Sequence, residues 1–198
     1  MIIFLNKNYE DPYVELHENY LKAVSANQTY IDAILISTYD ITKKEVDSRF
    51  VNLKFIDDRK LIFFTNYDSP KSNQIKNHNQ IAATFFWDSI NVQIRIKAKI
   101  KKTSVEFNQK YFSKRSLDKN ALAISSNQSK MVKSYDDVVK KYNKVKKFNN
   151  LKECPSNWGG YEFTPYYFEF WEGHNSRLNR RKAYKYDKNR WKKFFLEP

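Results

Sequence analysis

The chain has 198 residues, enough for one domain with a substantial core and too few for two ordinary domains. Lys and Arg total 36 against 22 Asp and Glu, so the formal net charge is +14 and favours anionic partners. The single Cys154 excludes an internal disulfide, and three glycines are too few for a Walker-type phosphate loop or a dinucleotide fingerprint.

The elements begin with an expected helix in PYVELHENYLKAVSAN, after the possible cap Asp11, with Val14, His17, Leu21 and Val24 near one face. Runs of β-branched and aromatic residues then predict five strands, separated by turn-forming DD, NYDSP and DS. These strands are YIDAILIST, SRFVNLKFI, KLIFFTN, IAATFFW and VQIRIKAKI.

Helical spacing is expected over 69–79 and 104–146, and strands return at 160–172, 181–186 and 190–195. Many short strands with interspersed helices favour a mainly β fold, a closed antiparallel barrel with peripheral helices, over a doubly wound sheet. The whole of 1–198 is expected to form one domain.

The N-terminal MIIFLNKNYEDPY has no basic n-region, long apolar region or cleavage site, so we expect no signal peptide. The apolar runs AILI and LIFF fall far below the roughly 20 residues that span a bilayer. Because the one cysteine also indicates a reducing compartment, we expect a cytoplasmic protein without a membrane partner.

The glycines Gly159, Gly160 and Gly173 fall in one segment, which indicates positive φ or close backbone approach there, or simply ordinary strand turns. The three histidines are too dispersed to predict a metal site, and no serine nucleophile motif is present. An enzyme of this kind is expected to use a cofactor for its chemistry.

Five blocks of the sequence follow one another along the chain, namely RFVNLK, FFTNYDSPKSNQI, FFWDSINVQIRIKAKI, KYFSKRSLDKNALAISSNQS, and PSNWGGYEF through EFWEGHNSRLNRR. In this order they resemble the pyridoxamine/pyridoxine 5′-phosphate oxidases. The resemblance implies an FMN-binding split β-barrel, with residues 150–198 as the C-terminal dimerisation and substrate segment. It also implies a homodimer with FMN at the subunit interface, and O2-dependent oxidation of pyridoxine or pyridoxamine 5′-phosphate to pyridoxal 5′-phosphate with release of H2O2.

Carried over position by position, the resemblance implies an FMN site of fourteen residues. They are Arg49, Phe50, Val51, Asn52, Leu53, Lys54, Phe64, Thr65, Lys71, Gln93, Gln128, Ser129, Trp171 and Arg181. Among them, the cationic side chains Arg49, Lys71 and Arg181 are suited to an anionic phosphate.

The implied substrate site contains Lys54, Tyr111, Arg115 and Lys119 around the phosphate, with Arg177 and Asn179 as catalytic residues near the reacting carbon. Three positions depart from the family. Pro70 stands in place of an arginine, Lys119 in place of a serine, and Asn179 in place of a histidine.

Two other functions stay open. One is a divergent FMN flavoprotein that oxidises another substrate, as phenazine-pathway oxidases of this superfamily do. The other is a basic nucleic-acid-binding barrel that uses exposed aromatic side chains. Most of the lysines are expected to lie on a solvated surface.

Overall fold

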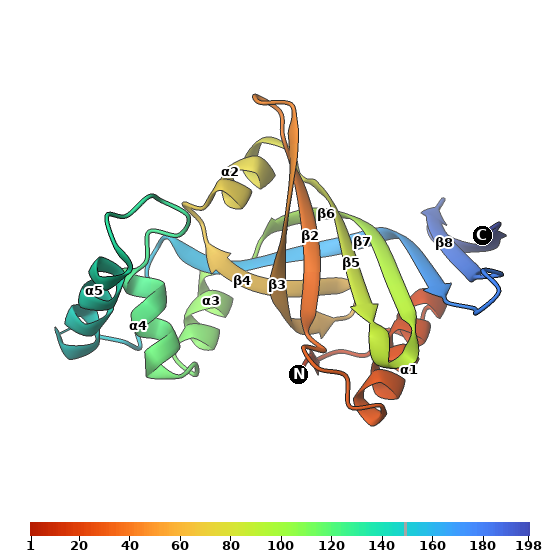
Figure 1. The fold of residues 1–198 in the computed structure, drawn as a ribbon, viewed down its shortest axis with the longest axis horizontal. Coiled ribbons are helices and arrows are strands. Elements are labelled where there is room, and N and C mark those ends of the chain that lie inside the picture. The colour runs from red at the N-terminus through yellow and green to blue at the C-terminus, as the bar shows by residue number, and fades with distance from the viewer. Residues whose placement is uncertain (149) are drawn as a thin grey trace.

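The computed structural model describes residues 1–148 and 150–198, which form a mainly β fold (Figure 1). The strands are β1 (Ile3–Phe4), β2 (Ala33–Asp40), β3 (Glu45–Asp57), β4 (Lys60–Asn66), β5 (Gln80–Trp87), β6 (Val92–Lys102), β7 (Trp158–Glu172), β8 (Arg180–Asp187) and β9 (Arg190–Leu196). The helices are α1 (Asp11–Ser25), α2 (Pro70–Asn77), the 3-10 turn η1 (Asp88–Ile90), α3 (Val105–Phe112), α4 (Leu117–Ser125) and α5 (Tyr135–Phe148).

Six strands close a barrel in the order β3-β2-β5-β6-β7-β4, and β4 returns to β3. Each of these six pairings is antiparallel, which confirms the predicted architecture. The alternating burial along β2 and β6 fits a sheet with one face on the core and one face outward. Large apolar side chains such as Ile34, Phe63, Phe85 and Phe163 fill the interior.

The long strand β7 connects the two ends of the molecule (Figure 1). Its first half pairs with β4, from Trp158 to Phe163, and its last residues pair with β8. Helices α3 to α5 lie at the end where β7 begins, and α1 and β8 lie at the other. Within the described residues, no helix is long and apolar enough to cross a membrane.

The predicted strands and helices are confirmed, with several corrections. The helical stretch 104–146 is divided into three helices by the connections at 113–116 and 126–134, and the short β1 was not predicted. Glu10, not Asp11, occupies the cap position of α1. The buried face of α1 is formed by Tyr13, Leu16, Tyr20 and Ala23 with Pro12, whereas Leu21 and Val24 are exposed.

The glycine pair lies inside β7 and not in a turn, and no glycine has a positive φ. Both positions require glycine because neighbouring side chains approach the backbone closely. A Cβ atom on Gly159 would lie 2.3 Å from the Tyr67 hydroxyl, and one on Gly160 would lie 2.6 Å from Thr103 Oγ1. The Tyr67 hydroxyl also donates to the carbonyl of Gly160 over 2.9 Å, so glycine lets α3 and the β4–α2 loop pack against β7.

Candidate active site

A cavity of about 950 Å³ lies between β3, β4 and helices α2 to α4. It brings together thirteen of the predicted site residues from five separate segments of the chain. These are Arg49, Phe50, Val51, Asn52, Lys54, Phe64, Thr65, Lys71, Tyr111, Arg115, Lys119, Gln128 and Ser129. Six basic side chains and the single carboxylate of Asp47 line the cavity, so its field attracts anions.

Lys71 lies at one end of the cavity, on the first turn of α2, where Pro70 occupies the first helical position. Its ammonium group donates to Thr65 Oγ1 over 2.8 Å, to Gln128 Oε1 over 2.9 Å and to Ser69 Oγ over 3.1 Å. All three acceptors are neutral, although the residue is only 7% exposed. Burial, with a smaller contribution from Arg49, lowers the pKa of Lys71 to about 8.

Arg49 extends from β3 toward the same end of the cavity. Its guanidinium pairs with Asp47, donates to Thr38 Oγ1, and donates to Gln74 Oε1 over 3.4 Å. These contacts hold a second cation near Lys71, and together the two side chains form a corner suited to a phosphate group.

Beside this corner, Phe64, Tyr111 and Trp158 form an aromatic wall of the cavity. The ring of Phe64 stacks on Tyr111 with centroids 3.9 Å apart and on Trp158 at 5.1 Å. Burial raises the pKa of the Tyr111 hydroxyl, which keeps it a neutral hydrogen-bond donor. A flat ligand can lie against such a surface.

Arg115 lies at the far end of the wall, in the connection between α3 and α4. Its guanidinium carbon is 4.5 Å from the Trp158 ring centroid, and Nη1 donates to Asn120 Oδ1 over 3.2 Å. Asn120 is fully buried and donates to the carbonyls of Phe112 and Leu151. Burial lowers the pKa of Arg115, which forms no ion pair with any carboxylate of residues 1–148 and 150–198.

Leu53 belongs to β3, as Arg49 and Lys54 do, but its side chain is fully buried in the core. Only the backbone of Leu53 can therefore reach a ligand in this cavity. The sequence prediction also omitted several residues that line it, namely Asp47, Asn66, Lys114, Ser116, Leu122, Ala123, Ser126 and Trp158. Trp158 directly precedes the glycine pair in the sequence. This cluster of aromatic and glycine residues was the sequence signal that could have placed Trp158 in the site.

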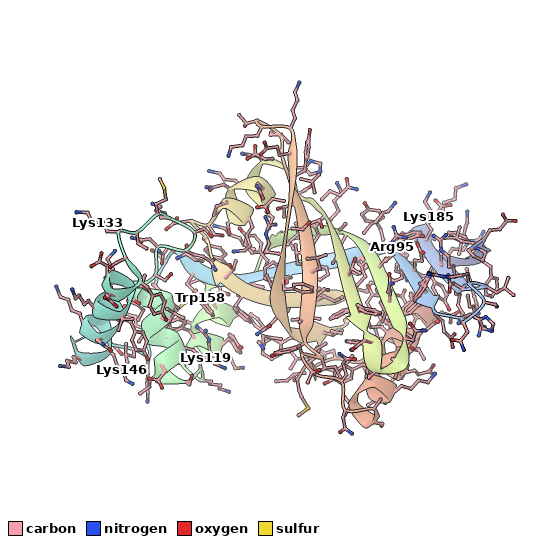
Figure 2. The ribbon with its side chains drawn as sticks, in the orientation of Figure 1. Arg95, Lys119, Lys133, Lys146, Trp158 and Lys185 are labelled. Carbon is pink, nitrogen blue, oxygen red and sulfur yellow. The ribbon has the colours of Figure 1, made fainter. Side chains whose placement is uncertain are left out.

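Gln93, Trp171 and Arg181 do not line this cavity. They form a second group, because Gln93 pairs with Trp171 across β6 and β7, and Trp171 pairs with Arg181 across β7 and β8. Side chains of directly opposed residues project from the same face of a sheet, so the three share one surface. In Figure 2, Arg95 and Lys185, from the neighbouring parts of β6 and β8, lie at the opposite end of the molecule from Lys119 and Trp158.

Arg181 is held in place on this surface by Glu169, whose side chain is 3% exposed. Glu169 Oε1 accepts from Arg181 Nε over 2.9 Å and forms an ion pair with Nη2 at 2.9 Å, and the same carboxylate contacts Arg95 at 3.2 Å. Arg181 also donates to the Glu197 carbonyl over 2.8 Å. Within one protomer, Arg181 therefore does not join Arg49 and Lys71.

Arg177 and Asn179 lie in the turn between β7 and β8, also outside the cavity of their own chain. Arg177 is exposed and has a positive φ of 66°. Asn179 Oδ1 accepts from the backbone N–H of His174 over 3.0 Å, which closes the turn. The side chain of Arg177 is thus presented to solvent in the protomer.

Comparisons with known proteins identify the family of this chain. Residues 22–149 match the family model for pyridoxamine 5′-phosphate oxidase, and residues 158–198 match the pyridoxine 5′-phosphate oxidase C-terminal dimerisation region. The chain is 30% identical over 192 residues to a pyridoxine/pyridoxamine 5′-phosphate oxidase of Pseudomonas putida (strain GB-1), covering 95% of this chain and 89% of that protein. It is 36% identical to pyridoxine/pyridoxamine 5′-phosphate oxidase 1 of Hydrogenovibrio crunogenus, covering 88% of this chain and 81% of that protein.

Two solved structures have the same fold. PhzG from Burkholderia lata, in complex with tetrahydrophenazine-1-carboxylic acid, superposes with a TM-score of 0.88 at 25% identity, covering 96% of this chain and 93% of that one. A pyridoxamine 5′-phosphate oxidase-related, FMN-binding protein from Nostoc punctiforme gives a TM-score of 0.79 at 13% identity, covering 96% and 99%. The family models and the relatives together establish that this chain belongs to the pyridoxamine 5′-phosphate oxidase family, a family of oxidoreductases.

Proposed function

We propose that this protein is an FMN-dependent oxidase that converts pyridoxine 5′-phosphate or pyridoxamine 5′-phosphate to pyridoxal 5′-phosphate. With the alcohol substrate, O2 becomes H2O2. With the amine substrate, water is also consumed and ammonia released. Family membership supports an oxidoreductase that uses a flavin, and the choice of FMN and of B6 phosphates is our proposal.

The observation that carries the proposal is the buried Lys71 ammonium beside Arg49. Three neutral oxygens satisfy its hydrogen bonds, yet no carboxylate of residues 1–148 and 150–198 pairs with it. A buried cation without a counter-ion is unfavourable, and a phosphate placed here would offset that cost. The donor set therefore fits the phosphate of FMN.

The remaining residues fit the other parts of the cofactor. The side-chain amide of Gln128 and the hydroxyls of Thr65 and Ser129 can bond polar groups, while Phe64 offers an apolar face. When bound, FMN would supply two-electron redox chemistry between the substrate and O2. The protein's part is to hold the substrate phosphate with Lys54, Tyr111 and Arg115 and to orient the reacting carbon.

Arg177 and Asn179 are proposed to act on the substrate held by the partner subunit, together with Gln93, Trp171 and Arg181 on the partner's cofactor. The match of residues 158–198 to a dimerisation region supports a homodimer, and all but one of these five residues lie in that region. In this arrangement each pocket takes Arg49 and Lys71 from one subunit, and Arg181 and the covering residues from the other.

Oxidation of a phenazine-type substrate is the second candidate. It is favoured by the likeness to PhzG, whose structure contains tetrahydrophenazine-1-carboxylic acid. Both oxidases require flavin, so uptake of FMN by apo-protein tests the cofactor assignment alone. A colourless protein that does not take up added FMN would instead favour the nucleic-acid-binding barrel.

Titration of apo-protein with FMN, followed by quenching of flavin fluorescence, is the direct test. Arg49→Ala is expected to weaken binding at least about tenfold, because a charge-assisted hydrogen bond contributes roughly 1.5 to 3 kcal/mol. Lys144→Ala, on the exposed surface of α5, is the matched control. Unchanged affinity in Arg49→Ala would remove Arg49 from the site.

A further inference from the structure

A buried carboxylate, that of Glu169, lies beside the surface that carries Trp171 and Arg181. Glu169 precedes Trp171 by two residues on β7, so the two side chains project from the same face of the sheet. The side chain of Glu169 is only 3% exposed within one protomer. A buried carboxylate is unfavourable unless its charge is paired and its oxygens are hydrogen-bonded, so its partners indicate its role.

Three side chains from β6, β7 and β8 hold this carboxylate. Arg181 Nε donates to Oε1 over 2.9 Å, and Arg181 Nη2 pairs with the same oxygen at 2.9 Å. Arg95 Nη1 lies 3.2 Å from each oxygen, and the Tyr167 hydroxyl donates to Oε2 over 3.0 Å. Burial and the nearby Glu169 carboxylate raise the pKa of Tyr167 to about 12, so the hydroxyl remains a neutral donor.

These contacts fix the orientation of the Arg181 guanidinium. Nε and Nη2 are held by Glu169, and Nη1 donates to the backbone carbonyl of Glu197 over 2.8 Å. A guanidinium has more N–H groups than these contacts use, so further donors are available to a ligand. Because Arg95 shares the carboxylate, the group of two arginines and one glutamate keeps a net positive charge.

We propose that Glu169 is the positioning residue for Arg181, whose guanidinium it holds in the orientation that meets the flavin cofactor of the partner subunit. The inference rests on the proposed function, in which Arg181 contacts that cofactor. A long side chain that is already held loses less conformational freedom on binding than one that moves in solvent. The contribution comes from the hydrogen bonds, because the charge of a carboxylate by itself repels an anionic cofactor.

Two substitutions of similar length separate the hydrogen bonds from the charge. Glu169→Gln and Glu169→Met both remove the negative charge and both fill the buried position. Glutamine keeps an oxygen that accepts from Arg181 and an amide that can donate to the Tyr167 hydroxyl, whereas methionine offers only a weak sulfur acceptor. In titrations of apo-protein with FMN, Glu169→Gln is expected to stay within about threefold of the parent Kd, and Glu169→Met to bind about tenfold more weakly.

A double-variant cycle tests whether Glu169 acts through Arg181. In an Arg181→Ala background, Glu169→Met is expected to cause no further loss of FMN affinity, because the group that it positions is gone. The control is Glu162→Met, on the same strand, which removes a carboxylate paired with Lys60 at 3.5 Å and Lys101 at 3.4 Å. This control is expected to leave the Kd for FMN within about twofold of the parent.

Arg181→Lys keeps the Glu169 carboxylate next to a cation, so it provides a second test that does not depend on whether Glu169→Met folds. Lysine retains the charge but has no planar fork to hold, and it is expected to bind FMN about tenfold more weakly than the parent. Parent-like affinity in Arg181→Lys, equal affinities of Glu169→Gln and Glu169→Met, or additive losses in the cycle would each overturn the positioning role. Those results leave the cofactor assignment intact if the parent binds FMN, whereas a parent that takes up no FMN contradicts the proposed function as well.

Discussion

Lys71 Nζ donates to Gln128 Oε1 over 2.9 Å, and this contact joins the first turn of α2 to the segment that follows α4. Thr65 Oγ1 on β4 donates to the same oxygen over 3.1 Å. Three segments that are far apart in the sequence thus meet at one buried ammonium group, which makes the corner rigid before any ligand arrives.

The lowered pKa of Lys71 predicts a pH-dependent cofactor affinity. Burial brings this pKa from its ordinary 10.5 to about 8, so above pH 8 the free protein loses the charge that would pair with a phosphate. Affinity for FMN is expected to fall about tenfold between pH 7 and pH 9, because binding must then take up a proton. Fluorescence titration across this range measures the effect.

Lys71→Met is the control for that titration, and it is expected to bind FMN weakly with little change over the same range. The apo-protein has the opposite dependence. Its stability is expected to rise between pH 8 and pH 10.5, because the unfolded chain keeps the lysine proton after the folded chain has lost it. A parent protein whose FMN affinity stays constant from pH 7 to pH 9 would show that Lys71 does not bind the phosphate.

Arg115 is expected to act on substrate binding and not on the cofactor. Arg115→Ala removes the guanidinium that Trp158 and Asn120 hold in place, so KM for pyridoxine 5′-phosphate should rise by about tenfold or more while the flavin spectrum stays unchanged. Steady-state kinetics over a range of substrate concentrations separate KM from kcat. An unaltered KM would exclude Arg115 from the phosphate site.

Because Arg49 and Arg181 lie in separate parts of the protomer, a complementation experiment can test whether one FMN pocket uses both residues. If each pocket uses Arg49 of one subunit and Arg181 of the other, Arg49→Ala and Arg181→Ala should each bind FMN poorly as homodimers. A heterodimer of the two variants would contain one intact pocket and one with both changes. Co-expression with two different affinity tags isolates it, and flavin absorbance measures the FMN bound per dimer.

About one FMN per heterodimer is the expected result, against little in either homodimer. Light scattering should give a mass of about 48 kDa, twice the 23.8 kDa of the chain. Failure of the heterodimer to regain any FMN would mean that the two arginines serve the same subunit or that one of them serves no cofactor site.

The turn between β7 and β8 provides a test of the catalytic assignment. Asn179 is neutral and shorter than histidine, and an orienting group misplaced by about 1 Å can cost about 100-fold in rate. Asn179→His is therefore expected to raise kcat/KM for pyridoxine 5′-phosphate, and Arg177→Ala to lower it without release of FMN. Oxygen consumption measures both variants. If neither changes the rate, this turn has no part in the reaction.

The sequence predicted the barrel well because alternation of apolar side chains is a local property. Strands such as β5 and β6 alternate buried and outward residues along their length, and both were predicted from that pattern. The buried face of α1 was harder to predict, because Tyr13 and Tyr20 are buried while Leu21 is exposed. Which of these side chains is buried depends on the barrel residues that pack against the helix, and the helix sequence alone does not show them. The two-residue β1 is too short to carry any periodicity.

For the site, resemblance predicted thirteen residues of one cavity, but the sequence could not show how their charges are arranged. Nothing local predicts that Lys54 is paired with Asp32 or that Asp118 turns toward Lys146, since both pairs join separate elements. Nor could it show that Arg181 is bonded to Glu169 at the other end of the protomer, because pairing between strands sets that position.

Aerobic incubation of FMN-loaded protein with pyridoxine 5′-phosphate, pyridoxamine 5′-phosphate and their unphosphorylated forms tests the central claim most directly. Pyridoxal 5′-phosphate and H2O2 should form in equal amounts from the two phosphorylated substrates, with far slower reaction of the unphosphorylated ones. A flavin-loaded protein that forms neither product from either phosphate would contradict the assignment of B6 oxidation.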